Sequence, residues 1–84
     1  MRELPVLLGN RIRELRRKKG FSQESFADHC HLHRTYMGGI ERGEHNLTIH
    51  TALTIAKGLG MSLSKLLSGI EEQMEGADSK PNAP

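Results

Sequence analysis

Apolar residues recur every three or four positions through most of the chain, and no segment alternates strictly between apolar and polar residues. This is the pattern of α-helices. Pro5 suits the first turn of a helix, and Gly20 suits the position just after a helix ends. Between them runs one apolar stripe, formed by Leu8, Ile12 and Leu15. We therefore predict a first helix over residues 5–19.

Two shorter helices joined by a tight turn are predicted within residues 22–43. Ser22 is a good N-cap for a helix over residues 23–30, and Gly43 suits the end of a helix over residues 34–42. The residues that would pack one helix on the other are Phe26, Ala27, Cys30, Met37 and Ile40.

The start of the second of these helices is free to face outward, because its packing residues lie further along. It carries Arg34, Thr35 and Tyr36, whose side chains can form hydrogen bonds. A compact helix that presents such side chains from its N-terminal end has the geometry that enters the major groove of DNA. The pattern therefore indicates a DNA-binding helix-turn-helix.

Two further helices are predicted, with Thr48 and Ser62 as their N-caps. Their apolar residues are Ile49, Ala52, Leu53, Ala56 and Leu59 in the fourth helix, which ends at Gly60, and Leu63, Leu66, Leu67 and Ile70 in the fifth. The second set is larger than one small helix needs, so we predict that it also forms a dimer contact. We expect one compact all-α domain of five helices over residues 1–76 and a disordered tail over residues 77–84.

The charge of the chain is unevenly distributed, although its net value is only +2. Basic residues dominate residues 1–20, and acidic residues dominate residues 71–80. The basic residues are Arg2, Arg11, Arg13, Arg16, Arg17, Lys18 and Lys19, and the acidic residues are Glu71, Glu72, Glu75 and Asp78. A polyanion such as DNA would be attracted to the first end only.

Several classes of function are disfavoured by the composition. Cys30 is the only cysteine, so no disulfide can form within the chain, and a reducing cytoplasm suits the protein. No apolar run is long enough to span a membrane, and residues 1–20 are too charged for a signal peptide. The chain contains neither an arrangement of Ser, His and Asp suited to catalysis nor a phosphate-binding glycine loop, so we expect no enzyme and no cofactor.

A histidine-rich run invites a metal-binding interpretation, because His29, His31 and His33 surround Cys30. A zinc, nickel or copper site needs three or four converging ligands. These histidines lie across a helix end and a turn rather than on one face. We therefore expect no metal site, and we expect Cys30 to be packed in the core.

Glu41 follows the inward-facing Ile40, so its carboxylate is expected to be partly buried and to need a partner. Arg16, near the end of the first helix, is the candidate. We predict an ion pair between Arg16 and Glu41 that joins the first and third helices. Gly38 and Gly39 are unfavourable inside a helix, so we expect one of them to permit the close approach of another group.

Three segments of the chain resemble the phage repressor and Cro type of helix-turn-helix domain, also called the XRE family. They are IRELRRKKGFSQESFA from Ile12, IERG at residues 40–43 and LTIAKGLGMSLSKLL at residues 53–67. Together they span residues 12–67, about two thirds of the chain. The resemblance implies a lambda-repressor-like fold. It also implies a transcriptional regulator that binds a palindromic operator in double-stranded DNA as a homodimer.

The resemblance also assigns roles to individual residues. Gln23 matches the phosphate-binding glutamine that opens the second helix of the family, and Arg16 and Glu41 match its internal ion pair. The matches within the recognition helix, residues 33–42, are Arg34, Thr35 and Tyr36 at its exposed start, and Gly39 one turn on, where many members place a base-contacting side chain.

Three positions depart from the family pattern. His31 stands at a turn position that usually holds glycine in a left-handed conformation, which His tolerates with strain. Leu47 replaces a common proline and should loosen the loop before the fourth helix. Gly39 offers no side chain to a base, so sequence reading must depend on the start of the recognition helix and on DNA shape.

We predict that two copies place their recognition helices in successive major grooves, about 34 Å apart, with Arg34 making a bidentate contact to guanine. Further DNA contacts are predicted for a wider set, formed by Lys18, Lys19, His33, Arg42, His45 and Asn46. Two alternatives stay open. One is an antitoxin that binds a protein partner and represses its own promoter, and the other is a controller of a restriction-modification system.

Overall fold

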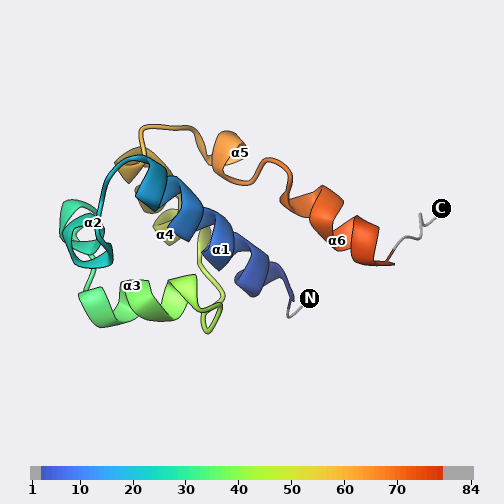
Figure 1. Ribbon diagram of the computed structural model, residues 1–84, viewed down its shortest axis with the longest axis horizontal. Coiled ribbons are helices and arrows are strands. Elements are labelled where there is room, and N and C mark those ends of the chain that lie inside the picture. Colours follow the sequence, from blue (N-terminus) through green and yellow to red (C-terminus); the bar gives the residue numbers. More distant parts are fainter. Residues whose placement is uncertain (1–2, 79–84) are drawn as a thin grey trace.

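The computed structural model describes residues 3–78 and shows helices packed around one core (Figure 1). The helices are α1 (Glu3–Lys18), α2 (Gln23–His29), α3 (Arg34–Glu41), α4 (Ile49–Gly58), α5 (Leu63–Leu66) and α6 (Ile70–Asp78). No strand is present in this part of the chain. The all-α prediction is confirmed, and α1 to α4 begin and end within two residues of their predicted limits.

Side-chain caps fix where three of the helices begin. Ser22, Thr48 and Ser62 each accept a hydrogen bond from the backbone N–H three residues further on, at 3.0, 3.1 and 3.1 Å. Ser22 belongs to a capping box, because its own N–H donates to the hydroxyl oxygen of Ser25 at 3.0 Å. The predicted N-caps of α2, α4 and α5 are therefore confirmed.

The extent predicted for the fifth helix is wrong. α5 is a single turn, and the chain bends at Gly69, whose φ of +85° is readily adopted only by glycine, before α6 begins at Ile70. The helical spacing of the apolar residues persists across the bend because Leu66 and Ile70 face the same core from either side of it.

α6 was not predicted, and it changes the expected boundary of the tail. The helix reaches Asp78, so residues 77 and 78 are helical rather than disordered. The rest of the predicted tail, residues 79–84, lies outside the described residues. α6 packs against α1, and both helices extend toward the right in Figure 1.

α1 is the helix against which α2, α3 and α6 pack. It crosses α3 at Gly9, where a Cβ atom would lie only 2.7 Å from the carbonyl oxygen of Glu41. Arg11 donates hydrogen bonds to the carbonyl oxygens of Lys65 and Leu66, at 2.8 and 2.5 Å, and so ties α5 to α1. Neither role is predicted from the sequence, although a glycine beside an apolar stripe is a signal of close backbone approach.

The core is formed by side chains from each helix within residues 3–78, together with the C-cap of α2 and the turn after α4. Its largest fully buried apolar members are Ile12, Phe26, Met37, Ile40, Ile55, Leu59 and Leu66. None of the helices described is both long enough and apolar enough to cross a bilayer.

Candidate nucleic-acid interface

The turn between α2 and α3 fixes the start of α3. The N–H of Leu32 donates to the carbonyl oxygen of Ala27 at 2.8 Å, which closes the C-terminus of α2. His31 adopts the left-handed conformation with φ of 60°, as the resemblance to the XRE family implies. His33 is the exposed N-cap of α3 and makes no capping hydrogen bond through its side chain.

The first turn of α3 faces outward, as predicted. Arg34 and Thr35 are exposed and Tyr36 is half-buried, whereas every residue from Met37 to Glu41 is buried. α3 therefore presents its N-terminal end and hides the rest of its length. This is the part of a recognition helix that contacts base edges in helix-turn-helix proteins.

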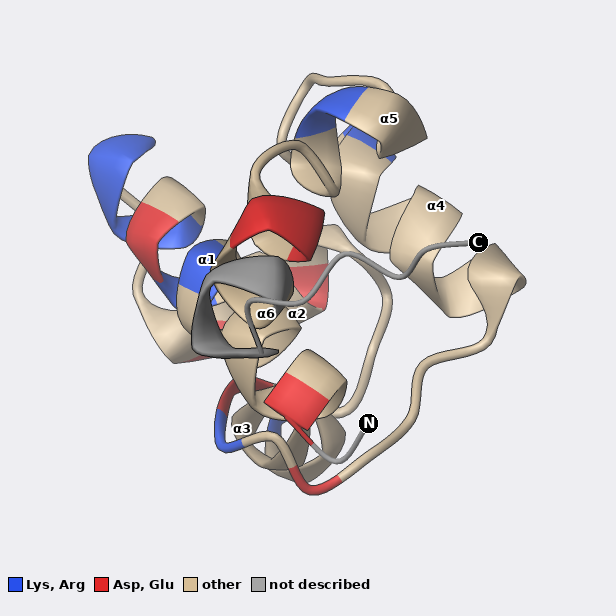
Figure 2. Ribbon diagram, turned by 90° about the vertical axis from the view of Figure 1, so that its right-hand side faces the viewer, with Lys and Arg blue, Asp and Glu red and all other residues tan. Residues whose placement is uncertain are grey.

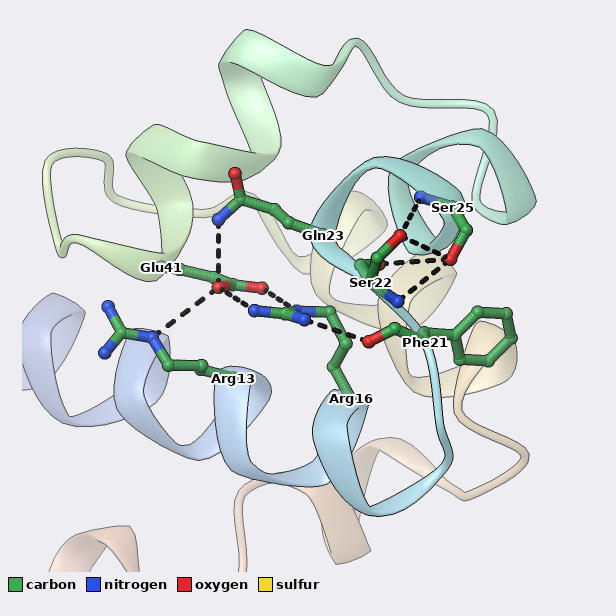
Figure 3. A network of polar contacts seen from close by, with 7 residues as sticks. All are labelled: Arg13, Arg16, Phe21, Ser22, Gln23, Ser25 and Glu41. Carbon is green, nitrogen blue, oxygen red and sulfur yellow. Dashed lines mark hydrogen bonds and ion pairs between the residues drawn. The ribbon is translucent and has the colours of Figure 1, made fainter.

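The buried end of α3 is held by a network around Glu41 (Figure 3). Arg16 on α1 donates from Nε and Nη2 to the two carboxylate oxygens of Glu41, at 2.7 and 2.9 Å. Gln23 on α2 donates to the same carboxylate at 3.1 Å, and Arg13 lies 3.7 Å away. Arg16 also donates to the carbonyl oxygen of Phe21 at 3.0 Å. The predicted ion pair between Arg16 and Glu41 is confirmed.

The electrostatic balance at Glu41 favours the carboxylate. Burial raises the pKa of Glu41, because it penalises the charged form. The hydrogen bonds from Arg16 and Gln23, together with the nearby guanidinium charges, lower the pKa by more than burial raises it. The net result is a pKa below the usual range of a glutamate, so the pair is charged at neutral pH.

Gln23 is predicted to contact a phosphate, and the structure places it between α2 and α3. Its Nε2 donates one hydrogen to Glu41, which fixes the amide at the N-terminus of α2. A glutamine amide carries a second hydrogen that this bond does not use. Gln23 is therefore oriented by the same carboxylate that holds α3.

Arg34 has one protein partner in the described structure. Its Nη1 lies 3.2 Å from a carboxylate oxygen of Glu24 on α2, and the two side chains are 64% and 73% exposed. Exposed pairs of this kind are weak. Both residues line a surface depression of about 410 Å³ beside the turn between α2 and α3. The Arg34 guanidinium is thus oriented but free to exchange its partner.

Gly39 is the glycine of α3 that another group approaches more closely, which agrees with the expectation that one of the two permits a close approach. A Cβ atom at Gly39 would lie 2.6 Å from Nε2 of His45, whereas one at Gly38 would lie 3.1 Å from its nearest neighbour, on Arg42. The ring of His45 also meets the ring of Tyr36, with centroids 5.0 Å apart and planes at 61°. The loop after α3 therefore covers Gly39.

The remaining predicted DNA contacts lie at the surface, on more than one side of the domain. A Cβ atom at Gly60, in the turn after α4, would lie 3.7 Å from Nζ of Lys19, so the end of α1 lies beside that turn. Lys18 and Lys19 are exposed at the end of α1, and Asn46 is exposed in the loop after α3. Arg42 is also exposed and donates two hydrogen bonds to Glu44, at 2.8 and 3.1 Å. Figure 2 shows the basic residues along α1 and the acidic residues at the start of α6.

The predicted dimer set is only partly exposed. Leu66 and Ile70 are 0% and 3% exposed and belong to the core of the chain, which corrects their expected place in a dimer contact. Leu63 is half-buried and Leu67 is 41% exposed. Ile49 is predicted to belong to the apolar face of the fourth helix, yet it is the most exposed large apolar residue described, at 74%.

Within the histidine-rich run, His29 packs against aromatic rings, and His31 and His33 are exposed. The ring of His29 lies 4.9 Å from that of Phe21 and 6.3 Å from that of Phe26, between centroids. Cys30 is buried as predicted, and burial raises its pKa to about 11. Among the described residues, no group of three or more His, Cys, Asp or Glu residues could hold a metal ion.

A pair of short helices, the second exposed at its start and held by buried contacts at its end, defines the class of helix-turn-helix DNA-binding domains. Residues 12–66 match the family model of the helix-turn-helix family HTH_3. The chain belongs to this family.

Three similar proteins cover most of the chain. The control protein C.MunI of Mycoplasma sp is 40% identical over 74 residues, covering 87% of this chain and 100% of C.MunI. The crystal structure of the restriction-modification controller protein C.AhdI from Aeromonas hydrophila is 42% identical, with a TM-score of 0.71, covering 74% of this chain and 94% of C.AhdI. The crystal structure of the restriction-modification controller protein C.Esp1396I, a tetramer in complex with its natural 35 base-pair operator, is 35% identical, with a TM-score of 0.75. The match covers 84% of this chain and 93% of the C.Esp1396I chain.

Proposed function

We propose that this protein regulates transcription by binding a palindromic operator as a homodimer, through α3 in the major groove. The observation that carries the proposal is the contrast within α3, whose first turn is exposed while its last residue is the buried Glu41. A helix fixed at its far end can enter a groove without reorganising. Its polar first turn then meets the base edges.

Arg34 is the proposed reader of guanine. Its guanidinium is exposed and is paired only with the exposed Glu24 in the described structure, so it can exchange that partner for the O6 and N7 atoms of guanine. Thr35 and Tyr36 are proposed to contact a thymine methyl group or a phosphate. Lys18, Lys19 and Arg42 are proposed to contact phosphates, which position the domain without selecting a sequence.

The proposed dimer contact involves α4 and α5, which pack together. The exposed large apolar residues here are Ile49 and Leu53 on α4 and Leu67, the C-cap of α5. A two-fold dimer through this surface would present two copies of α3, and two-fold symmetry in the protein matches a palindrome in the DNA. The related C.Esp1396I, which binds its operator as a tetramer, supports assembly of such chains on DNA.

The more specific proposal is a controller of a restriction-modification system, acting in the cytoplasm without catalytic activity. C.MunI and C.AhdI, which are named control or controller proteins, are 40% and 42% identical to this chain. The aligned regions cover at least 94% of the length of each relative. They favour a controller over an antitoxin.

Selection of bound fragments from random duplexes, read by sequencing, tests this function. We expect a two-fold symmetric sequence to be enriched, and we expect a mobility shift with the same sequence and with the region upstream of the protein's own gene. Binding that shows no sequence preference, or no binding at all, would contradict the proposal.

A further inference from the structure

We propose that the imidazole of His45 forms a hydrogen bond with a base in the major groove. It does so from the position that a side chain at residue 39 would occupy. The inference rests on the proposed DNA-binding function. It adds a specificity-determining residue that lies outside the recognition helix, in the loop that follows α3.

Position 39 belongs to the DNA-facing side of α3. It lies three and four residues after Tyr36 and Thr35, and residues at these spacings are neighbours on a helix surface. Gly39 is nevertheless buried. A Cβ atom there would lie 2.6 Å from Nε2 and 2.8 Å from Cδ2 of His45. The imidazole therefore occupies the start of the path that a side chain at residue 39 would take.

The loop and a neighbouring ring hold the imidazole in this place. The N–H of Glu44 donates to the carbonyl oxygen of Gly39 at 2.9 Å, which folds the loop back onto α3. The carboxylate of Glu44 is in turn held by Arg42 through two hydrogen bonds. The ring of Tyr36 meets His45 edge to face, a favoured arrangement of aromatic rings. His45 is thus oriented beside a residue that we assign to DNA contact.

The chemistry of the imidazole suits a purine. One ring nitrogen donates a hydrogen bond, and guanine presents acceptors at O6 and N7 in the major groove. Residue 39 lies about 7.5 Å along the helix axis from Arg34, at about 1.5 Å per residue. This distance is roughly two base-pair steps of 3.4 Å. His45 is therefore assigned to a purine at a base pair different from the one that Arg34 reads.

The test compares base preferences of His45→Ala and the unaltered protein, position by position, by selection from random duplexes. We expect His45→Ala to lose preference at one base pair in each half-site and to bind the selected duplex about 5- to 100-fold more weakly relative to random duplexes. Asn10→Ala, at an exposed position of α1 that is assigned no DNA contact, serves as the control. It is expected to leave the base preferences unchanged.

A second variant displaces His45 without removing it. The Cβ atom of Gly39→Ala would push the imidazole away from α3. Alanine favours a helix more than glycine does, so loss of specificity would not be due to a weakened α3. We expect Gly39→Ala to lose preference at the same base pair as His45→Ala, with unchanged or higher thermal stability by circular dichroism.

Each other outcome contradicts the inference. If His45→Ala weakened binding to selected and random duplexes equally, His45 would be a phosphate contact rather than a reader. Full retention of base preferences by His45→Ala, or losses at different base pairs in the two variants, would also overturn it. If the unaltered protein selected no sequence, the proposed function would fail, and the inference with it.

Discussion

At the scale of single residues, Glu41 links the stability of the domain to the position of its DNA-binding helix. Its carboxylate receives hydrogen bonds from Arg16 on α1 and Gln23 on α2, so three helices meet at one buried charge. Removing one member of a buried ion pair leaves the other charge unpaired in a medium that solvates it poorly. The placement of α3 therefore depends on both members of the pair.

Glu41→Gln is predicted to lower the free energy of unfolding by about 3–5 kcal/mol, because it leaves the buried Arg16 guanidinium without its counter-charge. Urea denaturation measures the loss. Glu44→Gln is the matched control, since it removes the same kind of charge from the exposed pair with Arg42 and should change the unfolding free energy little. Equal effects of the two substitutions would show that the buried pair has no special structural role.

The same carboxylate predicts a dependence of stability on pH. The pKa of Glu41 is lower in the folded chain than in the unfolded chain, so its contribution is complete above the usual glutamate pKa of about 4.3. It is lost as the pH falls through the lower pKa of the folded state. Unfolding free energies of the unaltered protein and of Glu41→Gln should therefore converge in acid. A difference that stayed constant from pH 7 to pH 3 would contradict this account.

At the scale of elements, the crossing of α1 and α3 sets where the recognition helix stands. Gly9 allows the backbone of α3 to approach α1 closely, and Arg16 on the next turns of α1 holds Glu41 at the same end of α3. The backbone contact at Gly9 and the ion pair at Arg16 therefore both hold the C-terminal end of α3 against α1. A side chain at Gly9 would separate the two helices.

Gly9→Ala is predicted to lower the free energy of unfolding by about 1–3 kcal/mol, the usual effect of overpacking. Because the methyl group would meet backbone carbonyl oxygens rather than a flexible side chain, little relaxation is available. The thermal midpoint should fall by about 4–8 °C per kcal/mol in a domain of this size. Asn10→Ala, at the adjacent exposed position of α1, is the control and should not lower the midpoint. An unchanged midpoint for Gly9→Ala would be inconsistent with the close crossing.

The helices and the ion pair could be predicted from the sequence because their signals are local or depend on simple burial. Ser22, Thr48 and Ser62 are N-cap residues that mark helix starts, and the position of Glu41 beside an apolar residue implied a buried charge. The bend at Gly69 was missed because apolar spacing continues across it. The contact of His45 with Gly39 was missed because a loop side chain that folds back onto a helix leaves no periodic signal.

At the scale of the whole molecule, the surface has two different faces to account for. The exposed start of α3 carries polar residues and the basic Arg34, whereas α4 and the C-cap of α5 carry exposed apolar residues. The first set suits a polyanion, and the second suits a second copy of the chain. The two proposed contacts therefore use different surfaces and can be tested separately.

Ile49→Glu is predicted to weaken the dimer without destabilising the monomer. Ile49 is 74% exposed at the first position of α4, where an acidic residue is favourable to the helix. Sedimentation equilibrium should show a shift from dimer to monomer at micromolar concentration. Leu4→Glu introduces the same change at a 37% exposed apolar residue of α1 and should leave the dimer intact. If Ile49→Glu remained a dimer, the contact would lie elsewhere.

The most direct test of the account is the ratio of dissociation constants for random and selected duplexes, measured at one salt concentration with the unaltered protein and with Arg34→Ala. If the first turn of α3 reads the operator, Arg34→Ala should reduce this ratio by about 5- to 150-fold, which corresponds to about 1–3 kcal/mol. An unchanged ratio, with both duplexes bound more weakly to the same degree, would contradict the claim that this turn reads the DNA sequence.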